Sequence, residues 1–167
     1  MSIFWQENTL EFPISFAMMK KKGGDIMTIP RPEHPRPQFM RSRWENLNGT
    51  WQFEIDNTCS GEDRGLQKPG VCLSSTITVP FCPESKLSGV GNTDFMNGVW
   101  YKRTVSYTPG EERVFLHFGA VDYKTTVYVN GQQCGTHFGG YVSFFFDIIL
   151  EYLCDILFVL HHKNVVF

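Results

Sequence analysis

Short segments in which apolar and polar residues alternate recur along much of the chain. An alternation with a period of two residues places one set of side chains on a buried face of a sheet and the other set on an exposed face. Segments with this alternation, or with runs of β-branched and aromatic residues, are Trp51–Ile55, Thr76–Val79, Val99–Tyr107, Arg113–Phe118, Thr125–Val129 and Ser143–Ile148. Each is predicted to be a β-strand, and the turn-forming stretches between them are predicted to be loops.

The dipeptide Asn130-Gly131 is the strongest turn signal in the sequence. A type I′ turn requires positive φ at both central residues, which asparagine and glycine tolerate. The dipeptide is therefore predicted to close a hairpin between Thr125–Val129 and a short strand that ends near His137. The whole pattern predicts an all-β chain of about eight short antiparallel strands with no long helix, which is typical of a β-sandwich or jelly roll.

Changes in composition along the chain predict four regions. Residues 1–27 show no clear period and are predicted to be a disordered lead. Residues 28–43 carry four prolines within Pro30–Pro37, and because proline blocks helices and donates no ladder hydrogen bond, they are predicted to form an extended arm over a surface. The sandwich domain is expected over residues 44–160, followed by a divergent tail at 161–167.

The segment that leads into this tail admits two structures. Asp147, Glu151 and Asp155 recur at every fourth residue, which would give a helix one acidic stripe. Ile156–Leu160 is equally typical of a final strand. A membrane span is not predicted, because these acids interrupt any apolar run of the ~20 residues that a span needs. We expect the residues after Ile149 to be poorly packed and to leave a sheet edge exposed.

Composition limits the partners of the chain. Fifteen phenylalanines suit a sheet-rich fold, and a formal net charge of −2 argues against a nucleic-acid partner, which usually requires a clustered basic face. The run Lys20–Lys22 is interpreted as a solvated tail. Five cysteines form no C-x-x-C pair, so we expect dispersed buried thiols in a reducing compartment, with no metal site and no cofactor. Because no signal peptide is convincing, the expected location is cytoplasmic.

Six segments carry a more specific signature through their order and spacing. They are Val79–Ser85, Asp94–Met96, Val99–Arg103, Phe118–Tyr123, Val127–Gly131 and His137–Tyr141. From about Pro30 to Ile148, the chain resembles the N-terminal sugar-binding domain of glycoside hydrolase family 2, the group of β-galactosidases, β-glucuronidases and β-mannosidases. The resemblance implies a jelly-roll sandwich of the galactose-binding-domain type. After Asp147 the sequence departs from the family pattern, which suggests a gene truncated or shifted in frame near residue 149, before the catalytic barrel.

The resemblance also implies a chemistry for the parent enzyme, the hydrolysis of O-glycosyl bonds by two glutamates on a downstream barrel. Retaining glycosidases hold their two carboxyl groups about 5–5.5 Å apart. Neither glutamate's motif occurs in this chain, so we expect the chain alone to be inactive, with no catalytic residue. The carboxylates inside the matched segments are expected to cap turns or to pair with Arg103 or Arg113. They are Glu84, Asp94, Asp122 and Asp147.

Two loops carry the candidate sugar contacts. Sugars stack their apolar ring faces on aromatic side chains, while a few fixed polar groups bind their hydroxyls. Asn92 and Asp94 lie in a loop that approaches the mouth of the active site in the family. His137 and Tyr141 flank a glycine pair near the rim that faces the barrel, and their alternative role is packing between domains. The two tryptophans of predicted strands are expected in the core; they are Trp51 and Trp100.

Three functions fit the resemblance. The chain is the sugar-binding and scaffolding domain of a family 2 glycosidase that acts on a β-linked glycoside or oligosaccharide, or it is a stand-alone carbohydrate-binding module. The third alternative is an assembly subunit that docks on a separate catalytic barrel or forms a homo-oligomer. A binding module should expose an aromatic platform on one sheet face, whereas a docking subunit should expose an apolar patch where its partner sits.

Overall fold

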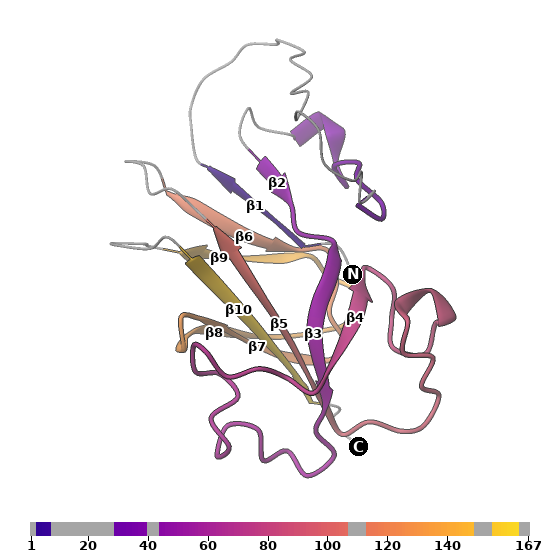
Figure 1. The fold of residues 1–167 in the computed structure, drawn as a ribbon. Coiled ribbons are helices and arrows are strands. Elements are labelled where there is room, and N and C mark those ends of the chain that lie inside the picture. Colours follow the sequence, from indigo (N-terminus) through magenta and orange to yellow (C-terminus); the bar gives the residue numbers. More distant parts are fainter. Residues whose placement is uncertain (1–2, 8–28, 40–43, 107–112, 149–154, 164–167) are drawn as a thin grey trace, which may run out of the picture.

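The computed structural model describes residues 3–7, 29–39, 44–106, 113–148 and 155–163 of the chain. Within these ranges it contains ten strands and two single turns of 3₁₀ helix (Figure 1). The strands are β1 (Ile3–Glu7), β2 (Trp44–Asn46), β3 (Gly49–Ile55), β4 (Ser75–Val79), β5 (Gly98–Ser106), β6 (Val114–Phe118), β7 (Lys124–Val129), β8 (Gln132–Phe138), β9 (Phe144–Ile148) and β10 (Asp155–Lys163). The 3₁₀ turns are η1 (Pro37–Phe39) and η2 (Lys86–Ser88).

The strands form two antiparallel sheets. One sheet has the strand order β2-β1-β6-β9, and the other has the order β4-β3-β5-β10-β7-β8. Every pairing in both sheets is antiparallel. The predicted all-β jelly-roll sandwich is therefore confirmed, and each of the eight strands expected from the sequence pattern has a counterpart within one or two residues at most ends.

The predicted hairpin at Asn130-Gly131 is also confirmed. Both residues have positive φ, 49° for Asn130 and 79° for Gly131, as a type I′ turn requires. The turn joins β7 directly to β8, whose register pairs Val129 with Gln132.

The prediction of a disordered lead is wrong for Ile3–Glu7, which forms β1 between β2 and β6. Ile3 is fully buried, its N–H donates to Oδ1 of Asn48 at 3.4 Å, and its carbonyl accepts the N–H of Leu47 at 2.8 Å. A strand of five residues whose partners are distant in sequence leaves only a weak periodic signal. The rest of the predicted lead, 8–27, lies outside the described residues.

The tail adopts the strand rather than the helix. β10 pairs with β5 on one side and with β7 on the other, so it fills an interior position of the six-stranded sheet. The expectation of an exposed sheet edge is therefore wrong for β10, because the backbones of β5 and β7 both pair with it. The strand also continues to Lys163, three residues beyond the predicted boundary of the sandwich at residue 160. Residues 149–154 and 164–167 lie outside the described part.

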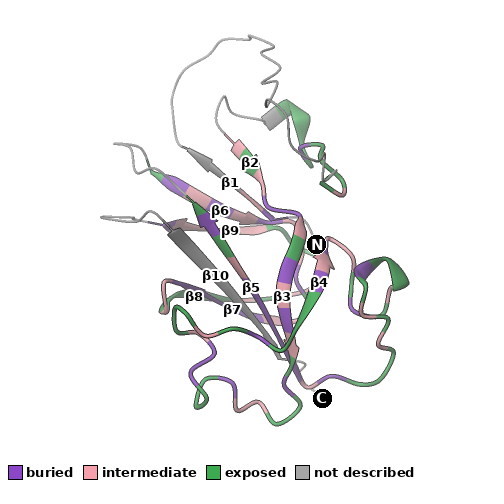
Figure 2. Ribbon diagram, in the orientation of Figure 1, coloured by how far each residue is buried: buried purple, intermediate pink, exposed green. Residues whose placement is uncertain are grey.

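The main core lies between the two sheets, and the buried residues are concentrated on the strands while most loops are exposed (Figure 2). β5 is buried on both faces: Val99 and Tyr101 belong to the core between the sheets, whereas Trp100 belongs to a second cluster. That second cluster lies under the loop 56–74, and its members are Leu66, Leu73, Trp100 and Tyr128, with Val71 packed against them. The expected burial of Trp51 and Trp100 is confirmed.

Asp56 holds this covering loop on the sheet. Its carboxylate accepts hydrogen bonds from the indole Nε1 of Trp100 at 3.1 Å and from the backbone N–H of Gly61 at 2.7 Å. Burial alone would raise the pKa of Asp56, but hydrogen bonds from Trp100, Gly61, Ser60 and Thr58 outweigh it and lower that pKa. Gly61 has to be glycine, since a Cβ there would lie 2.3 Å from the same indole nitrogen.

The proline-rich segment lies against β2, and it ends in the turn η1. Nδ2 of Asn48 donates to the carbonyls of Pro30 and Arg31 at 3.1 and 3.3 Å. His34 is buried, with its ring 4.9 Å from the ring of Phe4 and 4.8 Å from that of Trp44. The arm is thus bound to the sheet through its backbone carbonyls and one buried histidine.

The cysteines differ from expectation. Cys72, Cys82 and Cys134 are exposed and Cys59 is half-buried, so the prediction of buried thiols is wrong for these four, which form no disulfide with one another. They lie in loops or on the edge strand β8, where the side chains face solvent. Cys154 lies outside the described residues. In the described ranges, no helix is long and apolar enough to cross a membrane.

Candidate functional site

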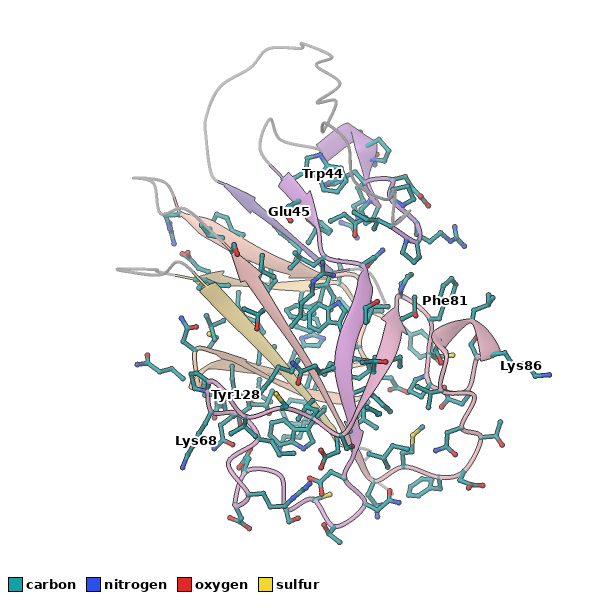
Figure 3. All side chains as sticks on the ribbon, viewed as in Figure 1. Trp44, Glu45, Lys68, Phe81, Lys86 and Tyr128 are labelled. Atoms are coloured by element: carbon teal, nitrogen blue, oxygen red, sulfur yellow. The ribbon has the colours of Figure 1, made fainter. Side chains whose placement is uncertain are left out.

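A pocket of about 320 Å³ opens at one end of the sandwich. Four segments line it: residues 80–84 after β4, the stretch from Met96 to Tyr101 at the start of β5, residues 120–122 before β7, and Gly140 after β8. Pro80 and Pro83 end β4 because neither can donate to a ladder. Figure 3 shows Phe81 and Lys86 on the segment that follows β4, on the opposite side of the molecule from Lys68 and Tyr128.

Tyr101 forms the floor of the pocket. The residue is only 6% exposed, and its ring meets the ring of Phe53 edge-on at 5.2 Å. Burial, together with the nearby Glu84 and Cys82, raises the pKa of Tyr101, so the phenol stays protonated at neutral pH. Both neighbours line the pocket, which places the hydroxyl at the pocket as well. No hydrogen bond to this hydroxyl is found among the described residues.

Two carboxylates stand at the rim. Glu84 and Asp122 both line the pocket and are exposed, and neither forms an ion pair within the described part of the chain. Asp122 packs against Gly140, where a Cβ would lie 2.6 Å from the carboxylate Oδ1. A glycine at this position therefore lets the carboxylate lie close to the loop backbone.

Backbone hydrogen bonds fix the loops around the pocket. The N–H of Asn92 donates to the carbonyl of Pro83 at 2.9 Å, which ties the loop before β5 to the pocket wall. On the other side, the N–H of Gly139 donates to the carbonyl of Tyr123 at 2.8 Å. The pocket is thus formed by loops that are bonded to one another across long sequence distances.

The predicted contacts Asn92 and Asp94 lie beside this pocket but do not line it. Oδ1 of Asn92 accepts the N–H of Asp94 at 3.2 Å, so the asparagine side chain shapes its own loop. The side chain of Asp94 is exposed.

His137 and Tyr141 also stay outside the pocket lining, although Gly140 between them belongs to it. The His137 ring stacks on Phe144, with the ring centres 4.0 Å apart and an angle of 15° between the planes. Its Nε2 is buried and has no hydrogen-bond partner in the described structure. Tyr141 is 101% exposed, and its ring is free to meet a ligand or a partner. The structure therefore brings the two predicted loops to one end of the sandwich without joining the four side chains into one cluster.

The matched carboxylates have separate roles. Asp147 forms an ion pair with Arg113, as expected, whereas Glu84 and Asp122 share the pocket, which the sequence alone did not indicate. The sequence also did not predict Tyr101 as a pocket residue, because a tyrosine with apolar neighbours in a strand is normally interpreted as part of the core. Among the described side chains, no three His, Cys, Asp or Glu residues gather into a potential metal site.

Known proteins are similar to this chain in sequence and in fold. No family model matches the chain. The beta-glucuronidases of Canis lupus familiaris and Felis catus are 30% and 31% identical to it over 128 residues, covering 69% of this chain and 19% of each relative. The solved beta-glucuronidase of Lactobacillus rhamnosus has a TM-score of 0.61 and 29% identity, over 71% of this chain and 20% of that one. A solved beta-glucuronidase of Ruminococcus gnavus has a TM-score of 0.56 and 26% identity, over 71% and 21%.

The jelly-roll sandwich and these relatives indicate the class of the chain, a β-sandwich domain like those found in glycosidases. The chain spans about one fifth of the length of the proteins it matches. These relatives confirm the resemblance to the N-terminal part of glycoside hydrolase family 2 enzymes that the six motifs predicted. Within that family, the relatives to which it is similar are beta-glucuronidases.

Proposed function

We propose that the chain is the N-terminal domain of a beta-glucuronidase-like glycosidase, where it braces the catalytic part and contributes a polar and aromatic rim to the sugar site. The parent enzyme would hydrolyse the O-glycosyl bond of a β-linked glycoside or oligosaccharide. The rim consists of Asn92, Asp94, His137 and Tyr141. The proposed location is cytoplasmic, on the basis of the unpaired cysteines.

One observation carries the docking part of this proposal. Eight large hydrophobic side chains are exposed in the described structure, and five of them lie within three positions of a residue that lines the pocket. The five are Leu87, Phe95, Phe138, Tyr141 and Val142. Exposed apolar groups gathered at one end are typical of a surface that packs on a partner. The partner proposed here is the catalytic barrel of the parent enzyme.

The domain is proposed to be inert by itself. A glycosidase needs one carboxyl group held neutral by an apolar environment and a second one held ionised at a fixed separation. Glu84 and Asp122 share a pocket, but both are exposed to water at its rim. Such a pair lacks the enclosed, water-excluding environment in which a glycosidase holds its two carboxyl groups.

A titration followed by NMR tests the sugar contact. Methyl β-glucuronide, β-galactoside and β-mannoside are added in turn to the ¹⁵N-labelled chain. We expect millimolar or weaker binding, because part of a site contributes roughly 4 kcal/mol or less, with shifts at the amides around Tyr141 and His137. Tyr141→Ala should remove these shifts, whereas Val142→Ala, at an exposed neighbour in the same loop, should not. Shifts that survive Tyr141→Ala unchanged would contradict the proposed rim.

The stand-alone binding module rests on a different surface. Phe145 is 58% exposed on the outer face of the four-stranded sheet, and its ring meets that of Phe115 edge-on at 5.6 Å. Beside it, however, Phe4 and His117 stack on each other at 4.7 Å, so their facing ring surfaces are covered. The same titration separates the two functions, since a binding module would show its shifts at Phe115 and Phe145.

A further inference from the structure

We propose that the pocket is a socket for the guanidinium group of an arginine side chain, presented by the protein segment that packs on this end of the sandwich. The identity of that segment rests on the proposed function, whereas the chemistry of the pocket stands on the residues that line it. Those residues come from four segments and include Tyr101, whose ring is buried and whose hydroxyl lies at the pocket.

The polar groups of the pocket match a donor-only ligand. Glu84 and Asp122 offer carboxylate oxygens, which only accept hydrogen bonds, and the phenol oxygen of Tyr101 is a third acceptor at the pocket. Among the described residues, no lysine, arginine or histidine lines the pocket. A guanidinium carries five N–H donors and no acceptor, so it can bond to all three groups at once.

The apolar groups match the rest of an arginine. Phe81, Met96 and Val99 line the same pocket and offer a surface for the three methylene groups of the side chain. A planar guanidinium also packs well on an aromatic face, which Phe81 and Tyr101 supply. A lysine ammonium would satisfy the charge but would leave the planar contact unused.

The rim of the pocket indicates that this cation belongs to a protein. Phe95, Phe138 and Tyr141 are exposed on the bordering segments. A ring of apolar contacts around a desolvated arginine is a common arrangement at protein interfaces, because the ring excludes water from the central charge. A free polar ligand would not need such a ring.

The same chemistry excludes an anionic sugar from the pocket. The carboxylate of a uronic acid would face Glu84 and Asp122, and no positively charged lining residue would offset the repulsion. If the proposed sugar contacts hold, they therefore fall on the loops outside the pocket.

The test compares two probes with capped termini, one with a charged side chain and one with a neutral side chain. N-acetyl-arginine amide and its uncharged isostere N-acetyl-citrulline amide are each titrated into the ¹⁵N-labelled full chain. We expect the arginine probe to shift the amides of Tyr101, Met96 and Gly140 and to bind about fivefold or more tightly than the citrulline probe. A double variant, Glu84→Gln with Asp122→Asn, should weaken the arginine probe by about four- to twenty-five-fold, since each of the two rim charges contributes roughly a factor of two to five. Tyr101→Phe should weaken it by less.

The matched control removes two exposed acids elsewhere. Glu33→Gln with Asp63→Asn changes the net charge by the same amount and should leave the binding of the arginine probe unchanged. Equal binding of the two probes, or equal weakening in the control variant, would overturn the proposal. So would shifts of the pocket amides by methyl β-glucuronide. If the sugars cause no shifts around Tyr141 but the arginine probe binds as expected, only the proposed sugar-binding rim is contradicted.

Discussion

Neighbouring residues of β5 meet two very different environments. On one face, Lys102 is fully buried under the covering loop, and its Nζ donates to the carbonyls of Val71 and Lys68 at 2.7 and 3.1 Å. On the other face, Tyr101 is nearly as buried, yet no partner for its hydroxyl is found among the described residues. Because that hydroxyl lies at the pocket, its hydrogen bond can come from water or from a ligand.

This difference in hydrogen bonding distinguishes the two faces of β5. The face under the covering loop has its polar groups bonded within the fold, whereas the face at the pocket leaves a polar group available to a ligand. A hydroxyl that meets water at a pocket contributes little to the free energy of folding, whereas a hydrogen bond to a charged group is worth about 1.5–3 kcal/mol. The covered face, with Asp56, Trp100 and Lys102 all bonded, should therefore dominate stability. The pocket face should contribute little to stability and should respond to ligands.

Trp100→Ala should have the largest effect on stability. The change leaves a cavity under the covering loop and removes the indole donor from Asp56, so we expect a loss of about 3–5 kcal/mol in the free energy of unfolding. Urea denaturation followed by circular dichroism measures it. Trp44→Ala, at a half-buried residue of the short strand β2, serves as the control and should cost clearly less. A loss below about 1 kcal/mol for Trp100→Ala would show that the covering loop adds little.

Asp56→Asn should lower stability by about 2 kcal/mol, because hydrogen bonds to a charged group are worth roughly 1.5–3 kcal/mol. The pKa of Asp56 is lowered in the folded state from its ordinary value of 3.8. The stability that its charge provides is thus complete above pH 3.8 and is lost as the pH falls through the folded pKa. Denaturation midpoints measured from pH 7 down to pH 3 should converge for the wild type and the variant at the acid end. A constant difference across that range would contradict this assignment.

Gly131→Ala should cost about 1–2 kcal/mol, because a left-handed φ of 79° disfavours a side chain. A Cβ at this position would also lie 3.1 Å from Cδ of Pro69 in the covering loop. Gly91→Ala is the matched control, since Gly91 has a φ of 63° and no atom within 4 Å of the added Cβ. The difference between the two melting temperatures isolates the contact between hairpin and loop. Equal losses would mean that this contact is absent.

Tyr101→Phe should have the smallest effect, with little or no change in stability, because it removes a hydroxyl that lies at the pocket and for which no hydrogen bond is found within the described residues. The same change should weaken binding of the arginine probe. A clear loss of stability would indicate that the hydroxyl already has a partner in the folded chain.

The sequence predicted the strands better than the site. Alternating residues mark β3, β5 and β7 because each strand places one face against a core, and Asn130-Gly131 marks a turn because few residues accept its φ values. β1 was not predicted because a strand of five residues shows too little alternation to be recognised. The acidic residues at every fourth position left β10 ambiguous, although Asp147 and Asp155 lie in two different strands. Only the packing of the sheets brings the pocket together from segments up to 60 residues apart, from Pro80 to Gly140.

The central claim is that the domain contacts a glycoside without cleaving it. Release of nitrophenol from 4-nitrophenyl β-glucuronide by the purified chain at high concentration tests this most directly. The account predicts no release above the buffer blank, and no difference between the wild type and the double variant Glu84→Gln with Asp122→Asn. Turnover by the wild type that the double variant abolishes would contradict it, because the two pocket carboxylates would then be an acting catalytic pair.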